Sequence, residues 1–508
     1  MPRPALPMLN RSGAGRPSAE RSRRRPGGVS PRVLRIEVLA AMVVGIALIP
    51  EAISFSVIAH VDPRVGLFAS FTMAVTISIV GGRPAMISAA TGSVALVVAP
   101  LSLKYGLQYL IAAVLLGGAL QVVLGLIGVA SLMRFVPRSV MTGFVNALGI
   151  LLFLAQVPNL RNVPWAVYPL VLLGLAIMVG FPKLTTVVPA PLVALVLLTT
   201  LTIGAGIAVP TVGDKGKLPN SLPHLGLPDV PYSVHTLGII ALPAVTMALV
   251  GLLESLLTAR LVDDLTDTGS NKNRESWGQG IANIVTGFFG GMGGCAMIGQ
   301  TMINIRSGAR TRLSTFLAGV FVLILVVVCG PVVSRIPMAA LVAVMVLVSV
   351  STFDWSSVGP GRLRRMPKSE TSVMVLTVVV TVSTGNLAYG VLAGVVLAAL
   401  LFARRVAHLS RIESELDPDG NRIVYRVGGE LFFASSANLV DEFDYENDPD
   451  QVVLDLTNSH IWDASTVAAL DQVVAKYAHR GKHVELVGMN RASQGMHDNL
   501  SGQLSSSH

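Results

Sequence analysis

Between Val33 and Arg405 the sequence is a series of apolar runs broken by glycine, proline and charged residues. A helix needs about 20 apolar residues to cross the hydrocarbon core of a bilayer. Runs of about that length lie near residues 36–59, 107–131, 139–157, 236–259, 313–335 and 386–403. Only 13% of the 508 residues are charged, compared with about 25% in a typical soluble domain. The sequence therefore predicts a polytopic α-helical membrane protein.

The basic residues predict how the chain is oriented in the bilayer. Residues 1–33 are rich in Pro, Gly, Ser and Arg, which is typical of a disordered basic tail. Arginine is favoured in cytoplasmic loops, and here it recurs in alternate loops, at Arg134, Arg260, Arg306 and Arg362 among others. We therefore expect cytoplasmic N- and C-termini in a bacterial-type inner membrane. This topology also accounts for the net charge of +9, so we expect no nucleic-acid partner.

Two apolar segments are too interrupted to form continuous membrane helices. Residues 84–100 carry the small polar triplet Thr91-Gly92-Ser93, and residues 292–305 overlap a glycine-rich run from Gly290 to Gly294. Glycine inside a helix is destabilising. Irregular backbone at membrane depth is tolerated only where protein or a water-filled cavity satisfies it. Both segments are therefore predicted to be broken helices beside a cavity.

Each break predicts a helix that starts within the bilayer, one near Gly92 and one near Ala296, with Cys295–Ile305 helical. The first N–H groups of a helix have no partner inside it, and the helix dipole makes this end positive. Two such ends in corresponding halves of a transporter indicate a binding site between them. We predict an anion site of backbone N–H groups helped by Thr91, Ser93 and Gln300. The alternative is that the small residues only allow close helix packing.

Glu51 and Glu254 are carboxylic acids inside apolar runs. A charged residue at the centre of a membrane helix costs about 2.5–3.5 kcal/mol on insertion scales, so an interior acid is a functional candidate. A carboxylate repels a bound anion unless a proton or cation arrives too, and this requirement would couple the two. Thr258 follows Glu254 by one helical turn on the same face. We predict that Glu254 and Thr258 couple transport to an ion, the alternatives being a structural hydrogen bond or a side chain that reaches the membrane interface.

The composition changes after Arg405, where charges become frequent. Alternating apolar and polar residues predict strands at 422–427, 452–456 and 482–487. Helical periodicity predicts helices at 434–443 and 465–477. We expect a small cytoplasmic α/β domain over residues 411–500 with a shortened last helix after Gly488, and a polar tail over 501–508. Asp463 is a natural N-cap for the second helix. Because no nucleophile and base form a catalytic pattern, we do not expect an enzyme.

Several stretches, taken in order, resemble the sulfate permease family of anion transporters. In the membrane part they are Ile49–Phe55, Leu253–Thr258, Asn271–Gly280 and Gly290–Thr311. In the soluble part, Asp455–Thr457 followed by Asp463–Ser465 resembles the sulfate-transporter and anti-sigma-antagonist (STAS) domain. The resemblance covers nearly the whole chain after the tail.

The resemblance implies a transporter domain over residues 34–406 with fourteen spans in two inverted sevens, divided into core and gate domains. It implies that spans three and ten are facing half-helices and that the core moves like an elevator against the gate. The substrate site then contains Glu51, Phe55, Thr91, Gly92, Ser93, Val94, Ala296, Met297, Ile298, Gly299 and Gln300. In relatives the acid that matches Glu254 serves Na⁺ or H⁺ coupling, and glutamate favours H⁺. Anti-sigma antagonists are phosphorylated at the position of Ser465, which makes Asp463 and Ser465 regulatory candidates.

The expected function is secondary active transport of an oxyanion, sulfate or bicarbonate, coupled to H⁺ or Na⁺. We expect a homodimer and no resident cofactor or metal. The alternatives are a dicarboxylate symporter of the same family, a nucleobase permease with the same inverted-repeat architecture, and a membrane sensor that binds an anion without transporting it.

Overall fold

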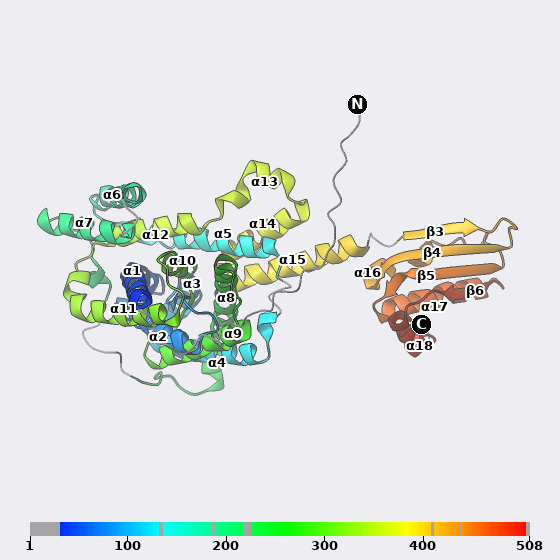
Figure 1. Cartoon of the computed structure of the whole chain (residues 1–508), viewed down its shortest axis with the longest axis horizontal. Coiled ribbons are helices and arrows are strands. Elements are labelled where there is room, and N and C mark those ends of the chain that lie inside the picture. Colours follow the sequence, from blue (N-terminus) through cyan, green and yellow to red (C-terminus); the bar gives the residue numbers. More distant parts are fainter. Residues whose placement is uncertain are drawn as a thin grey trace, which may run out of the picture.

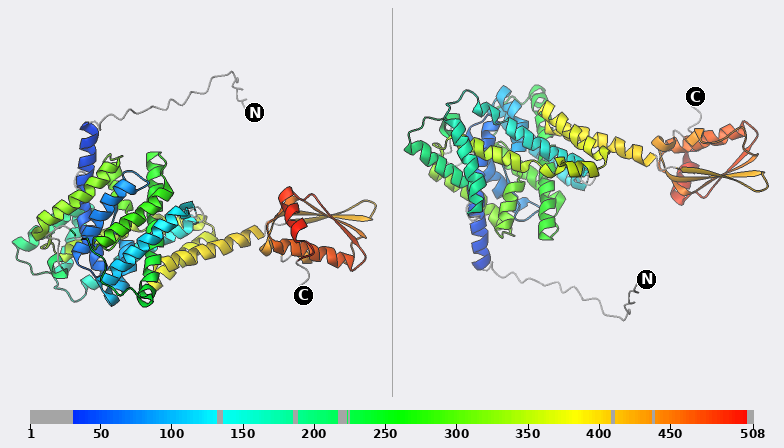
Figure 2. Two further views of the ribbon diagram at one scale, coloured as in Figure 1. Left: turned by 90° about the horizontal axis from the view of Figure 1, so that it is seen from below. Right: turned by 90° about the horizontal axis from the view of Figure 1, so that it is seen from above.

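A computed structural model describes residues 31–131, 136–184, 189–216, 223, 225–407, 411–436 and 439–503. A helical body is joined by a long helix, α15 (Leu387–Ala407), to a small α/β domain, and all three views show that domain away from the body (Figures 1 and 2). Most of the predicted tails, residues 1–30 and 504–508, lie outside the described residues. The first helix begins at Pro31, three residues inside the predicted N-terminal tail, because proline is well suited to the first turn of a helix.

Eight helices of the body pack mainly against one another and form what we call the core domain. They are α1 (Pro31–Ile58), α2 (Pro63–Val80), α3 (Gly92–Tyr105), α4 (Leu107–Leu126), α8 (Val234–Thr266), α9 (Lys272–Phe288), α10 (Ile298–Arg306) and α11 (Arg312–Val333). The closest associations are α4 with α9 and α8, and α11 with α1 and α2. The order of α1 to α4 is repeated in α8 to α11, as expected for an internal repeat.

The remaining long helices form a second group, the gate domain. They are α5 (Arg138–Leu154), α6 (Val167–Gly180), α7 (Ala190–Gly204), α12 (Met338–Thr352), α14 (Lys368–Thr384) and α15, with the short α13 (Pro360–Arg365) between α12 and α14. In this group α5 packs on α12, α14 and α15, and α6 packs on α7 and α12. Buried apolar side chains fill both groups and the seam between them.

Among the described residues, six helices are long and apolar enough to cross a membrane by themselves. A further five apolar helices are shorter, including α3, α7 and α12. A half-helix such as α3 cannot reach the length of a full span, so a length criterion cannot count it. The helical body thus has the long apolar helices of a membrane protein, and the number of fourteen spans stays a prediction.

Two short strands pair with each other where the broken segments meet. Strand β1 (Ser88–Ala89) pairs antiparallel with β2 (Cys295–Ala296), with Ala89 opposite Cys295. The prediction that Cys295–Ile305 is helical throughout was therefore wrong for its first residues, since α10 begins only at Ile298. The glycine run explains the close approach: a Cβ atom at Gly294 would lie 1.9 Å from the carbonyl oxygen of Ala89. Only glycine lets the two backbones pair at this depth.

The α/β domain contains a four-stranded sheet in the order β3-β4-β5-β6. Its elements are β3 (Arg411–Leu416), β4 (Arg422–Leu431), α16 (Phe433–Ser436), β5 (Gln451–Ile461), α17 (Ala464–Ala478), β6 (His483–Val487) and α18 (Arg491–Leu500). Strands β3 and β4 are antiparallel and the other pairs are parallel. The last helix, α18, is ten residues long.

The prediction of one helix over residues 434–443 was wrong. In the described part of this segment α16 ends at Ser436 and a short 3₁₀ turn covers Leu439–Asp441, while residues 437 and 438 are outside the description. The hydroxyl of Ser435 donates to the carbonyl oxygen of Glu430 at 3.0 Å. Such local side-chain bonds to the backbone compete with a continuous helix.

Candidate functional site

The starts of α3 and α10 are brought together by the β1–β2 pairing. Thr91 is the N-cap of α3, and its hydroxyl accepts a hydrogen bond from the Val94 N–H at 3.5 Å. Near α10, the Met297 N–H donates to the carbonyl oxygen of Ile87 at 2.9 Å. The Ala296 N–H donates to the Ser255 hydroxyl at 3.1 Å. Protein acceptors therefore already occupy the N–H groups of Val94, Ala296 and Met297.

Five N–H groups of the two first turns are left for a ligand. Within the described chain, no hydrogen bond to a protein acceptor is found for the N–H groups of Gly92, Ser93, Ile298, Gly299 and Gln300. A helix cannot satisfy these positions itself, and its dipole adds positive potential there. Among the predicted site residues, the N–H groups of Val94, Ala296 and Met297 bond to protein, so these three are not available as backbone donors.

A cavity of about 340 Å³ lies in front of these helix starts. Nine of the predicted residues line it: Glu51, Phe55, Thr91, Gly92, Ser93, Glu254, Met297, Ile298 and Gly299. Four predicted residues do not line it: Val94, Ala296, Gln300 and Thr258. The lining set of this described cavity contains two carboxylic acids, Glu51 and Glu254, and no lysine or arginine, so the donors it offers to an anion are backbone N–H groups and small hydroxyls.

The opposite wall comes from the gate domain, and none of its residues was predicted from the sequence. It consists of Phe144, Val145, Leu148 and Leu152 of α5 and Val348, Ser351 and Thr352 of α12, with Leu257 of α8 beside them. These are ordinary apolar or small polar residues of membrane helices. Nothing in their local pattern separates a cavity wall from a helix-packing face. The cavity therefore lies on the seam between core and gate.

Glu254 lies at the centre of a small polar network. Its Oε2 atom accepts hydrogen bonds from the Ser93 hydroxyl and from the Cys295 thiol, the latter at 3.1 Å. The Thr91 hydroxyl lies 3.1 Å from both the Ser93 hydroxyl and the Cys295 sulfur. Cys295 was not among the predicted site residues, because a single cysteine in an apolar run carries no distinctive signal. The network joins the starts of both half-helices to α8.

Thr258 takes no part in this network. Its hydroxyl donates to the carbonyl oxygen of Glu254 at 2.8 Å, and the side chain is fully buried. Threonine often bonds to the carbonyl four residues earlier in its own helix. The shared helical face was predicted correctly, but the contact is with the backbone of Glu254 and does not involve its carboxylate.

The second carboxylate, Glu51, is held by Gln300. The Nε2 atom of Gln300 donates to Glu51 Oε1 at 2.9 Å, which spans from α10 to α1. Gln300 is buried, and its Oε1 atom has no hydrogen-bond partner in the described structure. The Gln300 side chain thus bonds to Glu51, which lines the cavity, while Gln300 itself does not line it. Its predicted help in binding the anion stays a prediction.

In the α/β domain, Asp463 caps α17. Its Oδ1 atom accepts the Thr466 N–H at 3.0 Å, and its Oδ2 atom accepts the Phe433 N–H at 2.6 Å. Ser465 is exposed in the first turn of α17. The predicted N-cap is confirmed, and Asp463 also ties α17 to α16. Phosphorylation of Ser465 stays a prediction.

Comparison with known proteins agrees with this architecture. The sulfate permease family model matches residues 34–167 and 159–377, and the STAS domain model matches residues 413–500. A Bacillus subtilis (strain 168) protein named "Putative sulfate transporter YbaR" is 52% identical over 463 residues, which are 91% of this chain and 96% of that relative. "Bicarbonate transporter BicA" of Picosynechococcus is 24% identical over 90% of this chain and 89% of its own length.

Solved structures show the same fold. The transmembrane domain of a cyanobacterial bicarbonate transporter, BicA, superposes with a TM-score of 0.63 at 26% identity, over 72% of this chain and 98% of that chain. The overall structure of the SLC26A9 protein gives a TM-score of 0.78 at 16% identity, over 92% of this chain and 86% of that chain. The relatives are named as transporters, as expected for a chain that is not an enzyme. This multi-pass membrane protein therefore belongs to the sulfate permease family of anion transporters and ends in a STAS domain.

Proposed function

We propose that the chain carries out secondary active transport of an inorganic oxyanion, with sulfate as the first candidate and bicarbonate as the second, coupled to an inward flow of protons. One observation supports this most directly: unpartnered N–H groups from two helix starts face the same cavity as the carboxylate of Glu254. Sulfate and bicarbonate present several acceptor oxygens and no bulky apolar part, which suits a site built mainly from backbone donors.

The two carboxylates explain why a coupling ion is needed. Glu51 and Glu254 line the same cavity, and no basic side chain of the described residues lines it with them. A bound oxyanion and two carboxylates would repel one another strongly in a medium of low dielectric constant. Protonation of one or both carboxylates removes this repulsion and lets the anion bind. Anion and proton then cross together.

The surroundings of Glu254 favour H⁺ over Na⁺. Its Oε2 atom contacts the Cys295 thiol at 3.1 Å, and the Thr258 hydroxyl is directed to a backbone carbonyl. Hard cations prefer carboxylate, carbonyl and water oxygens, whereas sulfur is a soft ligand. A proton needs no such shell. Na⁺ coupling and exchange with a second anion are the alternatives that flux measurements separate.

We further propose an elevator-like movement of the core against the gate, a homodimeric assembly and a bacterial-type inner membrane with cytoplasmic termini. The site residues of α1, α3, α8 and α10 all belong to the core, while α5 and α12 of the gate close the other side. A shift of the core would carry the bound anion past a fixed wall. A cross-link between core and gate should stop transport, and one inside the core should not.

The test is uptake of radiolabelled sulfate and bicarbonate into proteoliposomes under imposed H⁺ or Na⁺ gradients. We expect an inward proton gradient to stimulate sulfate uptake by wild-type protein. In Glu254→Gln the stimulation should vanish, because the amide cannot take up the proton. Asp264→Asn, on an exposed position of the same helix, is the control and should behave as wild type. Glu254→Gln uptake with an unchanged response to the proton gradient would refute the coupling role.

The dicarboxylate alternative is tested in the same vesicles with fumarate. The family match and the STAS domain argue against a nucleobase permease. A sensor would bind anion tightly and give no flux, so equilibrium binding measured beside uptake distinguishes it from a transporter.

A further inference from the structure

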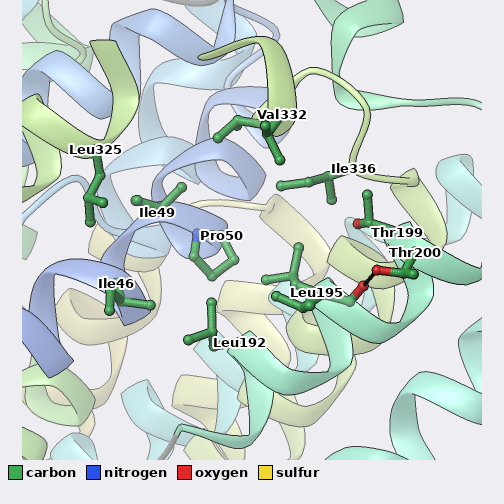
Figure 3. A pocket seen from close by; sticks show the side chains of 12 residues that line it. Ile46, Ile49, Pro50, Leu192, Leu195, Thr199, Thr200, Leu325, Val332 and Ile336 are labelled. Carbon is green, nitrogen blue, oxygen red and sulfur yellow. Dashed lines mark hydrogen bonds between the residues drawn. The ribbon is translucent and has the colours of Figure 1, made fainter. Parts of the chain in front are cut away.

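A second cavity, unrelated to the anion site in its chemistry, lies between the core and the gate. It measures about 340 Å³, and its walls are almost entirely aliphatic (Figure 3). Ile49 and Pro50 of α1 form one wall, Leu195 and Val196 of α7 a second, and Val332 with Ile336 at the end of α11 a third. We call it the seam groove. Pro50 lines this groove and the next residue, Glu51, lines the anion cavity, so α1 separates the two.

The seam groove opens onto the apolar outer surface of the helical body. Val196 is 55% exposed and Val332 is 64% exposed although both line the groove. Their neighbours Leu197 and Val328 are also exposed, at 50% and 71%. In a membrane protein a continuous aliphatic surface of this kind faces lipid tails. The groove is therefore open to the hydrocarbon part of the bilayer.

A second, more polar pocket lies next to one end of the seam groove. Val333 and Ile336 line the groove, while the two residues between them, Ser334 and Arg335, line a separate cavity of about 440 Å³ together with Thr211. Helices α7 and α11 both end here, which is where a membrane interface is expected. Arg335 is exposed, and among the described residues no carboxylate lies within ion-pair distance of it.

We infer that the seam groove binds one acyl chain of an anionic phospholipid whose phosphate group lies at Arg335. A lipid tail leaves one apolar environment for another when it enters the groove, so the groove alone selects little. The guanidinium group supplies the selection. It pairs with the phosphate of any phospholipid, but a neutral phospholipid also carries a cationic group that offsets its phosphate, whereas an anionic one keeps a net negative charge. A basic residue near a membrane surface favours anionic over neutral lipid by about fivefold.

A lipid bound in the seam groove would affect the equilibrium between arrangements of the core and the gate. It lies where core helices α1 and α11 meet gate helix α7, so its shape must change if the core moves against the gate. A ligand that fits one arrangement better than another shifts the population toward the first. The bound lipid would thus favour the arrangement described here.

The experiment is native mass spectrometry of the full-length protein, mixed with phosphatidylglycerol or phosphatidylcholine and released from detergent. Two variants are matched with two controls. Val196→Trp fills the seam groove, whereas Leu197→Trp places the same ring on the adjacent, equally exposed position outside it. Arg335→Gln removes the cation, and Arg161→Gln removes an exposed arginine elsewhere.

We expect wild type and both controls to retain phosphatidylglycerol in preference to phosphatidylcholine. Arg335→Gln should lower that preference about fivefold, and Val196→Trp should lower retention of both lipids. Equal retention of the two lipids by wild type, or unchanged retention in both test variants, would overturn the inference. A change of oligomeric state in Val196→Trp without loss of bound lipid would also overturn it, because the groove would then be a protein interface.

Discussion

Gly92 lies where the first turn of α3 meets both the gate and the core. A Cβ atom at this position would lie 2.5 Å from Leu152 Cδ2 on α5 and 3.0 Å from Phe55 Cε1 on α1. Carbon atoms pack best at about 3.5–4.0 Å, so Gly92→Ala forces the Leu152 methyl group to move by about 1 Å. Overpacking of a buried site costs about 1–3 kcal/mol. We expect about 1 kcal/mol, the lower end, because the end of a leucine side chain can shift.

This cost falls on the arrangement in which α3 lies against α5. Since about 1.4 kcal/mol changes a population tenfold, the rate of sulfate uptake by Gly92→Ala should fall about fivefold. Adding Leu152→Ala should restore much of the rate, because it removes the group that the new methyl strikes. Gly238→Ala is the control, since no atom lies within 4 Å of a Cβ there.

The assay is initial uptake into proteoliposomes at matched protein content, with the thermal unfolding temperature measured for every variant. The steric explanation is refuted if Gly92→Ala transports at the wild-type rate. It is equally refuted if Leu152→Ala fails to rescue Gly92→Ala while all variants remain folded. If the variants that lose uptake also have a lower unfolding temperature, the cause is damage to the whole fold.

Three further predictions concern single residues. Asp463→Ala removes the cap of α17 and should destabilise the STAS domain by about 1 kcal/mol in chemical unfolding, whereas Ser465→Ala, at an exposed position, should change little. Burial raises the pKa of Tyr445 to about 12, compared with about 10 in an unfolded chain. The raised pKa of Tyr445 therefore stabilises the folded state fully below about pH 10, and this contribution is lost as the pH rises toward 12. Between these pH values Tyr445→Phe should lose less stability than wild type, as measured by circular dichroism. Gly294→Ala should abolish sulfate binding measured by calorimetry, because its methyl group would lie 1.9 Å from the Ala89 oxygen and separate β1 from β2.

Several residues that line the cavity between core and gate could be named from the sequence, because two strong local signals mark them. Glycines from Gly290 to Gly294 cannot continue a helix, and acids such as Glu51 and Glu254 are rare in apolar runs. Both signals depend on the cost of placing polar groups in a membrane. That cost is the same in any fold, so it can be recognised without coordinates.

Other parts of the site depend on contacts between distant segments. Cys295 reaches Glu254 only because β2 pairs with β1, and Gln300 reaches Glu51 only because α10 packs against α1. The gate wall, including Leu152, consists of residues that occur throughout membrane helices. Periodicity gives the face of a helix but not its hydrogen-bond partners. It placed Thr258 on the face of Glu254, but it could not show that the Thr258 hydroxyl bonds to the backbone carbonyl of Glu254.

The pairing of β1 with β2 also has a consequence for how the protein is made. Ser88 and Ala89 find their backbone partners in Cys295 and Ala296, which a ribosome adds roughly 200 residues later. At about 5–20 residues per second, the first half of the chain waits roughly 10–40 s for those partners. During that time its strand lies in or beside a membrane without the hydrogen bonds that a bilayer demands. Insertion of the first repeat must therefore remain unfinished until the second arrives.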